Sequence, residues 1–243
     1  MIECPFSLLR NAVTKKQNSA EAVKLESIIE QVLDYAKAEG ASSAEADIGA
    51  GEGLSVTVRL GELETIEHQR DKGLGITVYM GQRKGSSSTT DFSSEAIKAS
   101  VYAACTIAKN ASSDKYAGLI ASEYIAQELP ALDLHHPWNI SAEAATGLAI
   151  DCETIARNAD SRITNADGTA VNSYSGKHVY GNSHGFIGGW EWSSHSIDCT
   201  VIADENGMQR DGWYSKARCA DDLETPKSIG EKAAQRTVAR LGA

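Results

Sequence analysis

Six histidines are the residues of this 243-residue chain whose type could support metal-dependent hydrolysis. A zinc peptidase helix of the His-Glu-x-x-His type places two imidazoles on one face and uses the glutamate as a base. No histidine in this sequence is followed by glutamate; the six are His68, His135, His136, His178, His184 and His195. The sequence therefore excludes a zinc helix of this type.

A looser metal site could use residues that fall in one predicted run of strands, namely His178, His184, His195 and Cys199. The last two are four positions apart, which on an extended strand puts them about 13 Å from each other. Two bonds of about 2 Å to one ion do not bridge that distance. Turns that gather the four are the alternative, but solvated or core-edge histidines are favoured, and we predict no metal and no cofactor in this chain.

A serine nucleophile is suggested only by Gly181-Asn-Ser-His-Gly185, which matches Gly-x-Ser-x-Gly. The nucleophile elbow needs a strand before the serine and a helix after it. Residues 186–192 continue instead as a strand interrupted by glycines, so a hairpin turn is predicted. The run Gly81–Ser88 lacks the Gly-Lys-Ser/Thr end of a phosphate loop. No catalytic residue is predicted.

Aromatic residues gather in the second half of the chain and form the candidate surface for a peptide or protein partner, which comprises Tyr180, Phe186, Trp190 and Trp192. Aromatic side chains are enriched where proteins bind each other. Packing within a core or on a sheet face is the alternative interpretation.

Composition restricts the partners further. The formal net charge of −10 and the absence of a lysine and arginine cluster disfavour nucleic acid and anionic membranes. The N-terminus lacks the pattern of a signal peptide, and no apolar run approaches about 20 residues, so a cytoplasmic protein is expected. The five cysteines are scattered, which indicates reduced thiols.

The elements that would position these residues begin after a polar leader, residues 1–18. Ser19 is expected to cap a helix from Ala20 to Gly40. Strand patterns follow at 47–48 and 54–60, and residues 63–92 add three apparent strands divided by glycine turns, giving a meander of about four or five strands. A helix capped at Ser93 closes this half, and a connector over 112–138 places a domain boundary near 130–140.

The second half repeats this order. Ser141 is expected to cap a helix, and a meander follows from Ile163 to Lys216, with hairpin turns at Asp167-Gly168 and Asn206-Gly207. Thr225-Pro226 opens the last helix. The predicted fold class is α+β, with two consecutive helix–antiparallel β-meander–helix units.

An ordered series of short segments carries a family resemblance. The segments are Leu74-Gly-Ile-Thr-Val-Tyr79, Arg83-Lys-Gly-Ser86, Ser88-Thr-Thr-Asp91, Arg162-Ile-Thr-Asn165, Gly181-Asn-Ser-His-Gly185, Ser194-His-Ser196, Val201-Ile-Ala203, Glu205-Asn-Gly207, Arg210-Asp211, Asp222-Leu223, Thr225-Pro226 and Arg236-Thr237. Together they resemble the TldD/PmbA family of peptidases, and within it the PmbA type, also called TldE. The resemblance spans most of the chain from the first helix onward.

The resemblance implies a cytoplasmic heterodimer with a TldD-type subunit that cleaves unfolded proteins or small peptides, including peptide-antibiotic precursors and an antitoxin. In such a pair the TldD-type subunit carries the zinc on a His-Glu-x-x-x-His helix, and the PmbA type lacks it. After the leader at 1–18, it also implies the family's N-terminal α/β domain at 19–130 and its central α/β domain at 131–243. The family's C-terminal domain is expected to be absent.

Two hypotheses follow for function. The first is the N-terminal part of a non-catalytic PmbA/TldE-type subunit that offers sheet edges to an extended substrate. The alternative is a stand-alone peptide- or protein-binding or regulatory module without protease activity.

Overall fold

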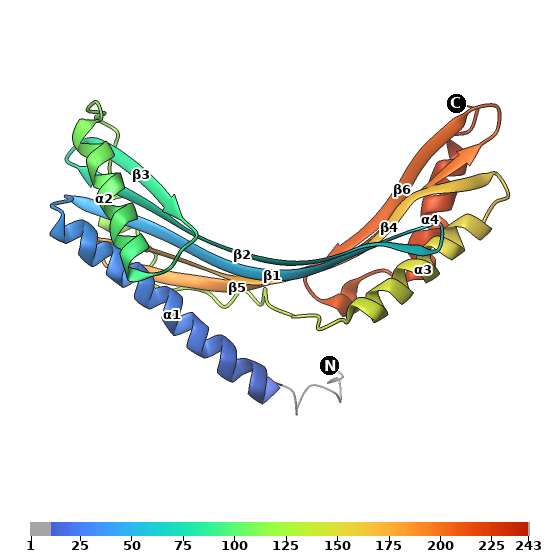
Figure 1. Cartoon of the computed structure of the whole chain (residues 1–243), viewed down its shortest axis with the longest axis horizontal. Helices are drawn as coiled ribbons and strands as arrows, with labels where there is room; N and C mark the ends of the chain where they lie inside the picture. The colour runs from blue at the N-terminus through green and yellow to red at the C-terminus, as the bar shows by residue number, and fades with distance from the viewer. Residues whose placement is uncertain (1–10, 243) are drawn as a thin grey trace. The chain divides into compact units, whose positions relative to one another are not determined.

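The computed structural model describes the backbone of residues 11–242 and the side chains of residues 25–242. The helices and strands follow one another in the order shown in Figure 1. They are α1 (Asn11–Ala38), β1 (Ser43–Arg59), β2 (Glu62–Met80), β3 (Arg83–Thr89), α2 (Ser94–Asn110), the 3-10 turn η1 (Ser122–Tyr124), α3 (Ala142–Asn158), β4 (Ile163–Asn182), β5 (Ile187–Asp204), β6 (Met208–Ala217), the 3-10 turn η2 (Ala220–Asp222) and α4 (Pro226–Ala239).

All six strands belong to one sheet, in the order β3-β2-β1-β4-β5-β6. The outer pairs β2–β3 and β5–β6 are antiparallel; Met80 lies opposite Arg83, and Asp204 lies opposite Met208. The α+β class with antiparallel strands is therefore confirmed. The arrangement as two repeated, consecutive units stays a prediction.

The chain forms two compact units, each built from separate stretches of sequence. Unit 1 comprises the described residues up to Ala50 together with 71–131 and 177–190, and unit 2 comprises 51–70, 132–176 and 191–242. The four long strands β1, β2, β4 and β5 contribute residues to both units. The domain limits expected near residue 130 remain a prediction.

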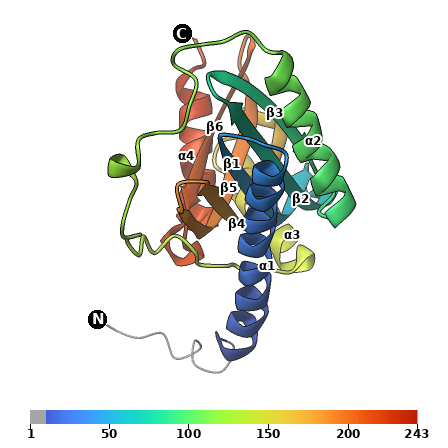
Figure 2. The ribbon, with the colours of Figure 1, turned by 90° about the vertical axis from the view of Figure 1, so that its left-hand side faces the viewer.

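In unit 1, α1 and α2 pack on one face of the strands, and both lie next to each other in Figures 1 and 2. Strand residues that alternate along β1 and β2 meet the apolar sides of both helices. The core includes Ile29, Val32, Ala46, Ile48, Ile76, Val78, Ile97, Val101 and Val179. Ser93 caps α2 as expected, because its hydroxyl accepts a hydrogen bond from the amide of Ala96 at 3.3 Å.

In unit 2, α3 and α4 pack on one face in the same way. The core includes Val56, Val58, Ala149, Cys152, Val171, Cys199, Val201, Ile229 and Ala233. Ser141 caps α3, and Thr225 caps α4 with proline at the first helical position, as the sequence predicts. Each cap satisfies an amide that the first helical turn leaves without a partner.

Glycines inside β1 and β2 do not form the turns that the sequence suggested. The patterns at 47–48 and 54–60 fall in the single strand β1, which ends at Arg59, and residues 63–66 and 76–80 belong to the single strand β2. A Cβ at Gly53 would overlap the ring of Tyr174, and one at Gly75 would lie 2.5 Å from Asp47 Oδ1. Glycine is needed at these positions because neighbouring atoms come close, so the expected count of strands was too high.

Three further expectations concern two predicted turns and the start of the first helix. Asn206-Gly207 forms the β5–β6 hairpin turn, with Asn206 at φ 60°. Asp167-Gly168 lies inside β4 instead, where Gly168 adopts φ 143°, so the turn predicted there was wrong.

The helix expected from Ala20 begins at Asn11, because good helix formers such as Lys15 and Lys16 extend it beyond the apolar stripe. Residues 1–10 of the expected leader lie outside the described residues. Among the described helices, none has the length and apolar run that crossing a membrane requires.

Candidate functional site

A carboxylate shared by two tyrosines is the most elaborate polar arrangement on the strands of unit 1. The hydroxyl of Tyr79 donates to Glu45 Oε1 at 2.7 Å, and the hydroxyl of Tyr180 donates to Glu45 Oε2 at 2.8 Å. The side-chain amide of Asn182 donates to the Tyr180 hydroxyl at 3.4 Å. Strands β1, β2 and β4 are therefore joined through one carboxylate.

Alternation along the strands puts these side chains on the face away from α1 and α2. Ala44 and Ala46 on β1 enter the helix-covered core, so Glu45 between them points to the opposite face. The same holds for Tyr79 next to Val78 and for Tyr180 next to Val179. The sequence thus brings three distant residues to one face by strand periodicity alone.

The turn between β4 and β5 anchors β1 beside this site. The amide of Ser183 donates to the carbonyl of Ala44 at 2.8 Å, and the amide of Ala44 donates to Ser183 Oγ at 3.0 Å. Gly185 allows the turn with φ 94°. The hairpin predicted for Gly181–Gly185 is therefore confirmed, and a strand-to-helix nucleophile elbow is not formed at Ser183.

Both phenols are held in their protonated, donating form. Burial, followed by the hydrogen bond to Glu45, raises the pKa of Tyr79 well above its usual value. Burial also raises the pKa of Tyr180, and the hydrogen bond to Glu45 acts in the same direction. Because each phenol gives its only proton to Glu45, the carboxylate acts as the acceptor of both.

Aromatic rings and a second acid lie on the strands of unit 1 and on the turn between β4 and β5. The ring of Phe186 lies 6.0 Å from that of Tyr180, and the rings of His178 and Trp190 lie 4.6 Å apart. Asp47 is exposed, two residues after Glu45 on the same strand. We call this set the Glu45 face; its members are Glu45, Asp47, Tyr79, His178, Tyr180, Phe186 and Trp190.

Three of the four residues in the candidate surface predicted from the sequence belong to the Glu45 face: Tyr180, Phe186 and Trp190. Trp192 belongs to unit 2, where it is half-buried. The sequence analysis missed Glu45 and Tyr79. A usable signal was present at Glu45, because Glu45 and Asp47 alternate with the apolar residues Ala44, Ala46 and Ile48.

The residues considered for metal binding are not gathered. In unit 1 His178 stacks on Trp190 and His184 is exposed, whereas in unit 2 His195 and Cys199 are fully buried. Across residues 25–242, no three His, Cys, Asp or Glu side chains are arranged to hold a metal ion. Within the same range, no hydrogen bond joins Ser183 to a histidine.

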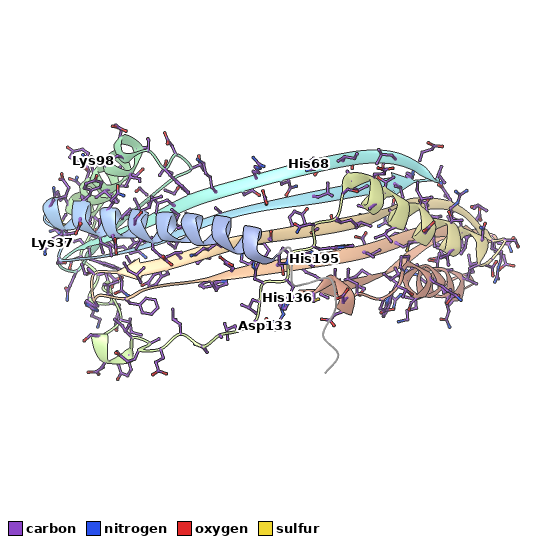
Figure 3. The ribbon with its side chains drawn as sticks, turned by 90° about the horizontal axis from the view of Figure 1, so that it is seen from below. Lys37, His68, Lys98, Asp133, His136 and His195 are labelled. Carbon is purple, nitrogen blue, oxygen red and sulfur yellow. The ribbon has the colours of Figure 1, made fainter. Side chains whose placement is uncertain are left out.

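His195 instead holds the connector against β5 in unit 2. Its Nε2 lies 2.9 Å from the carbonyl oxygen of His136, and its Nδ1 lies 3.1 Å from Ser173 Oγ. The amide of Ser193 donates a hydrogen bond to the carbonyl of Leu134 at 2.9 Å, and Ser193 Oγ accepts one from the amide of His136 at 2.8 Å. Figure 3 shows His195 beside His136, and His136 also contacts Asp133. His195 is therefore a structural residue.

The chemistry of the Glu45 face is that of binding. Its carboxylate is occupied by two neutral phenols, and no nucleophile with an adjacent base accompanies it among the described side chains. What the face offers is negative charge beside exposed aromatic surface, with Trp190 46% exposed. Such a combination suits extended or cationic polypeptide.

Two family models match the chain. One, described as PmbA/TldA metallopeptidase domain 1, matches residues 44–108. The other, described as PmbA/TldA metallopeptidase central domain, matches residues 135–241. Both matches include the strands that carry the residues discussed above.

Curated relatives agree with these matches. The chain is 42% identical over 226 residues to metalloprotease PmbA of Escherichia coli O157:H7, covering 93% of this chain and 50% of that protein. It is 41% identical over 223 residues to the PmbA homologue of Haemophilus influenzae, covering 91% and 49%. The chain thus spans about half the length of the curated relatives it matches.

Solved structures share the fold. A putative modulator of DNA gyrase from Bacteroides thetaiotaomicron superposes with a TM-score of 0.82 at 20% identity, covering 89% of this chain and 50% of that one. TldE from Thermococcus kodakarensis superposes with a TM-score of 0.68 at 16% identity, covering 87% and 47%. At these identities the likeness concerns the fold alone.

Proposed function

Because this chain belongs to the PmbA/TldD family of metallopeptidases, we propose that it serves as the non-catalytic, PmbA/TldE-type component of a two-subunit zinc peptidase. Its partner is a TldD-type subunit that carries the zinc and cleaves the peptide bond. The proposed substrates are unfolded proteins and small peptides, including precursors that require maturation, and the proposed compartment is the cytoplasm.

One observation carries this proposal: 42% identity to a PmbA protein over 93% of the chain, in a sequence without any His-Glu pair. The similarity supports the peptidase family, and the missing pair supports a role other than zinc binding. The proposal assigns no catalytic residue to this chain.

The test uses this chain, a TldD-type subunit from the same organism, and an equimolar mixture of both. We expect the two proteins to co-elute in size-exclusion chromatography, and we expect the chain alone to leave an unstructured reporter peptide intact. Cleavage by the chain alone that a chelator abolishes would contradict the non-catalytic role. Failure to co-elute would contradict the heterodimer.

We propose further that the Glu45 face is the surface that meets peptide or partner, with Trp190 as its most exposed ring at 46%. The Trp190→Ala variant should weaken peptide binding or co-elution. Tyr102→Ala is the matched control, because Tyr102 is also an exposed aromatic residue of unit 1, at 61%, but lies on α2. Equal effects of both variants would contradict this assignment.

The alternative function is a binding or regulatory module that acts without a peptidase. Absence of co-elution together with retained peptide binding would favour it.

The division into two helix–meander–helix halves, residues 19–130 and 131–243, is part of the main proposal. Limited proteolysis should cut first in the connector at 112–138, where the exposed side chains include Tyr116, at 82%, and Tyr124, at 71%.

A further inference from the structure

One edge of β2 in unit 2 lacks a neighbouring strand. On one side β2 adjoins β1, and on the other side it adjoins β3. The pairing with β3 runs only from Leu74 to Met80. Among the described residues, no strand therefore lies beyond Glu62–Arg70, and Figure 3 shows His68 on the outermost strand. We call this segment the β2 edge.

Solvent reaches the whole length of the β2 edge. All nine of its residues are exposed, whereas Leu74, Ile76 and Val78 farther along the same strand are buried. Its two large apolar side chains, Leu63 and Ile66, are 46% and 44% exposed. A long exposed edge offers unpaired N–H and C=O groups to another extended chain.

The edge is also held in position. Its hairpin turn, Leu60-Gly61, donates backbone amides to the buried carboxylate of Glu153, with Leu60 N at 3.1 Å from Oε1 and Gly61 N at 2.6 Å from Oε2. Glu153 comes from α3 and is fully buried. A strand that is ordered before binding loses less conformational entropy when a partner adds to it.

The charge of the β2 edge selects among possible partners. The segment carries three glutamates, Glu62, Glu64 and Glu67, and one cation, Arg70, which pairs with Glu52 at 3.7 Å. A second copy of this chain would bring these glutamates close to one another, which is destabilising. An extended segment with lysine or arginine would complement them.

We propose that the β2 edge binds an extended polypeptide segment rich in lysine or arginine by adding it as a further strand. This extends the peptide-binding role proposed above to a second surface, which lies in unit 2 and does not require the TldD-type subunit. Recognition combines backbone hydrogen bonds, which tolerate many sequences, with the glutamates, which prefer basic ones.

The position of the hairpin turn identifies a residue for the test. Because a two-residue turn separates Arg59 from Glu62, these two residues pair with each other. In an antiparallel ladder the next residue, Leu63, directs its N–H and C=O outward. Leu63→Pro removes an outward N–H, and Leu63→Ala is the matched control that keeps it.

The probe is a fluorescently labelled, nine-residue peptide of alternating lysine and valine, and the readout is anisotropy. Leu63→Pro should weaken binding about tenfold relative to Leu63→Ala. Replacing Glu62, Glu64 and Glu67 together by glutamine should also weaken peptide binding about tenfold at low salt. The difference between this variant and the unmodified chain should vanish near about 0.5 M salt, because salt ions then screen the charges of the glutamates. A peptide with glutamate in place of lysine should not bind.

Equal binding to Leu63→Pro and Leu63→Ala would overturn strand addition, and equal binding of the lysine and glutamate peptides would overturn charge selection. No binding at all would also overturn the inference and leave the glutamates as a guard against edge-to-edge aggregation. Co-elution with the TldD-type subunit is measured in parallel. Co-elution without peptide binding rejects this inference alone, and peptide binding without co-elution rejects the heterodimer alone.

Discussion

The two units use the same construction and differ in what their helix-free faces carry. In unit 1 a charged acceptor, Glu45, joins β1, β2 and β4 through two phenols. In unit 2 the face opposite the helices carries a neutral ladder, in which Ser55 Oγ donates to Asn172 Oδ1 at 2.6 Å and Asn172 Nδ2 donates to Ser196 Oγ at 3.2 Å. Strands can thus be tied across one face by either kind of bond.

The difference bears on function. A hydrogen bond to a charged group is stronger than a neutral one, and aromatic surface beside it favours contact with a partner. The neutral ladder of unit 2 satisfies its own polar atoms and offers little to a ligand. We therefore place the proposed peptide recognition at an edge in unit 2 and on a face in unit 1.

The largest expected effect is that of removing the shared carboxylate. Glu45→Ala leaves the hydroxyls of Tyr79, which is 4% exposed, and Tyr180 without their acceptor. We expect the free energy of unfolding of unit 1 to fall by about 2 to 3 kcal/mol. Native-state hydrogen exchange should show the loss in residues 43–50 and not in unit 2. Asp47→Ala, an exposed acid on the same strand, is the control and should cost little.

The second effect is a sensitivity to alkaline pH that belongs to unit 1. The folded state raises the pKa of Tyr79 above its unfolded value, so the unfolded chain loses this proton first. The contribution of the Tyr79 phenol to the free energy of unfolding is complete below about pH 10. Above that pH the free energy of unfolding falls by up to about 1.4 kcal/mol for each pH unit. Tyr79→Phe should flatten this fall in denaturation curves measured at several pH values. An unchanged slope would show that burial and the hydrogen bond to Glu45 do not raise the pKa of this phenol.

Local chemistry explains which features the sequence predicted. The caps Ser93, Ser141 and Thr225 and the turn Asn206-Gly207 depend on residues a few positions apart, so pattern alone located them. The sequence suggests separate strands at 47–48 and 54–60, although Gly53 between them lies inside β1, because a glycine that forms a turn and one that admits a distant side chain look alike in sequence. The side chain in question, Tyr174, is supplied by another strand.

The Glu45 face shows the same limit for a site. Strand alternation was enough to place Glu45 opposite the core, but its partners are 34 and 135 positions away in the sequence. Which strands lie side by side decides these pairings, and no local pattern encodes the strand order. Trp190 and Trp192 were grouped as aromatic residues of one predicted meander, yet β5 passes from unit 1 to unit 2 between them.

A third, smaller effect tests the neutral ladder. Asn172→Ala removes the acceptor of Ser55 and the donor to Ser196, both of which are half-buried. We expect a loss of about 1 kcal/mol, because water reaches part of the gap and neutral bonds contribute modestly. The measurement is chemical denaturation, with Asn172→Asp as a second variant that keeps an acceptor for Ser55. A loss as large as that of Glu45→Ala would remove the contrast between the two faces.

The smallest effect is an acid sensitivity in unit 2. Lys232, followed by Ser228 and Trp213, donates to Glu224 and lowers its pKa to about 2. Because the folded pKa lies below the unfolded value of about 4.3, this stability is complete above that value and is lost as pH falls toward 2. The side chain is 31% exposed, so solvent screening limits the contribution to less than about 1 kcal/mol. Glu224→Gln should therefore lower stability slightly at pH 7 and converge with the unmodified chain near pH 2. Glu231→Gln, which changes an exposed glutamate on α4 next to Lys232, should leave stability at both pH values unchanged. A difference between Glu224→Gln and the unmodified chain that persists at pH 2 would point to packing in place of charge.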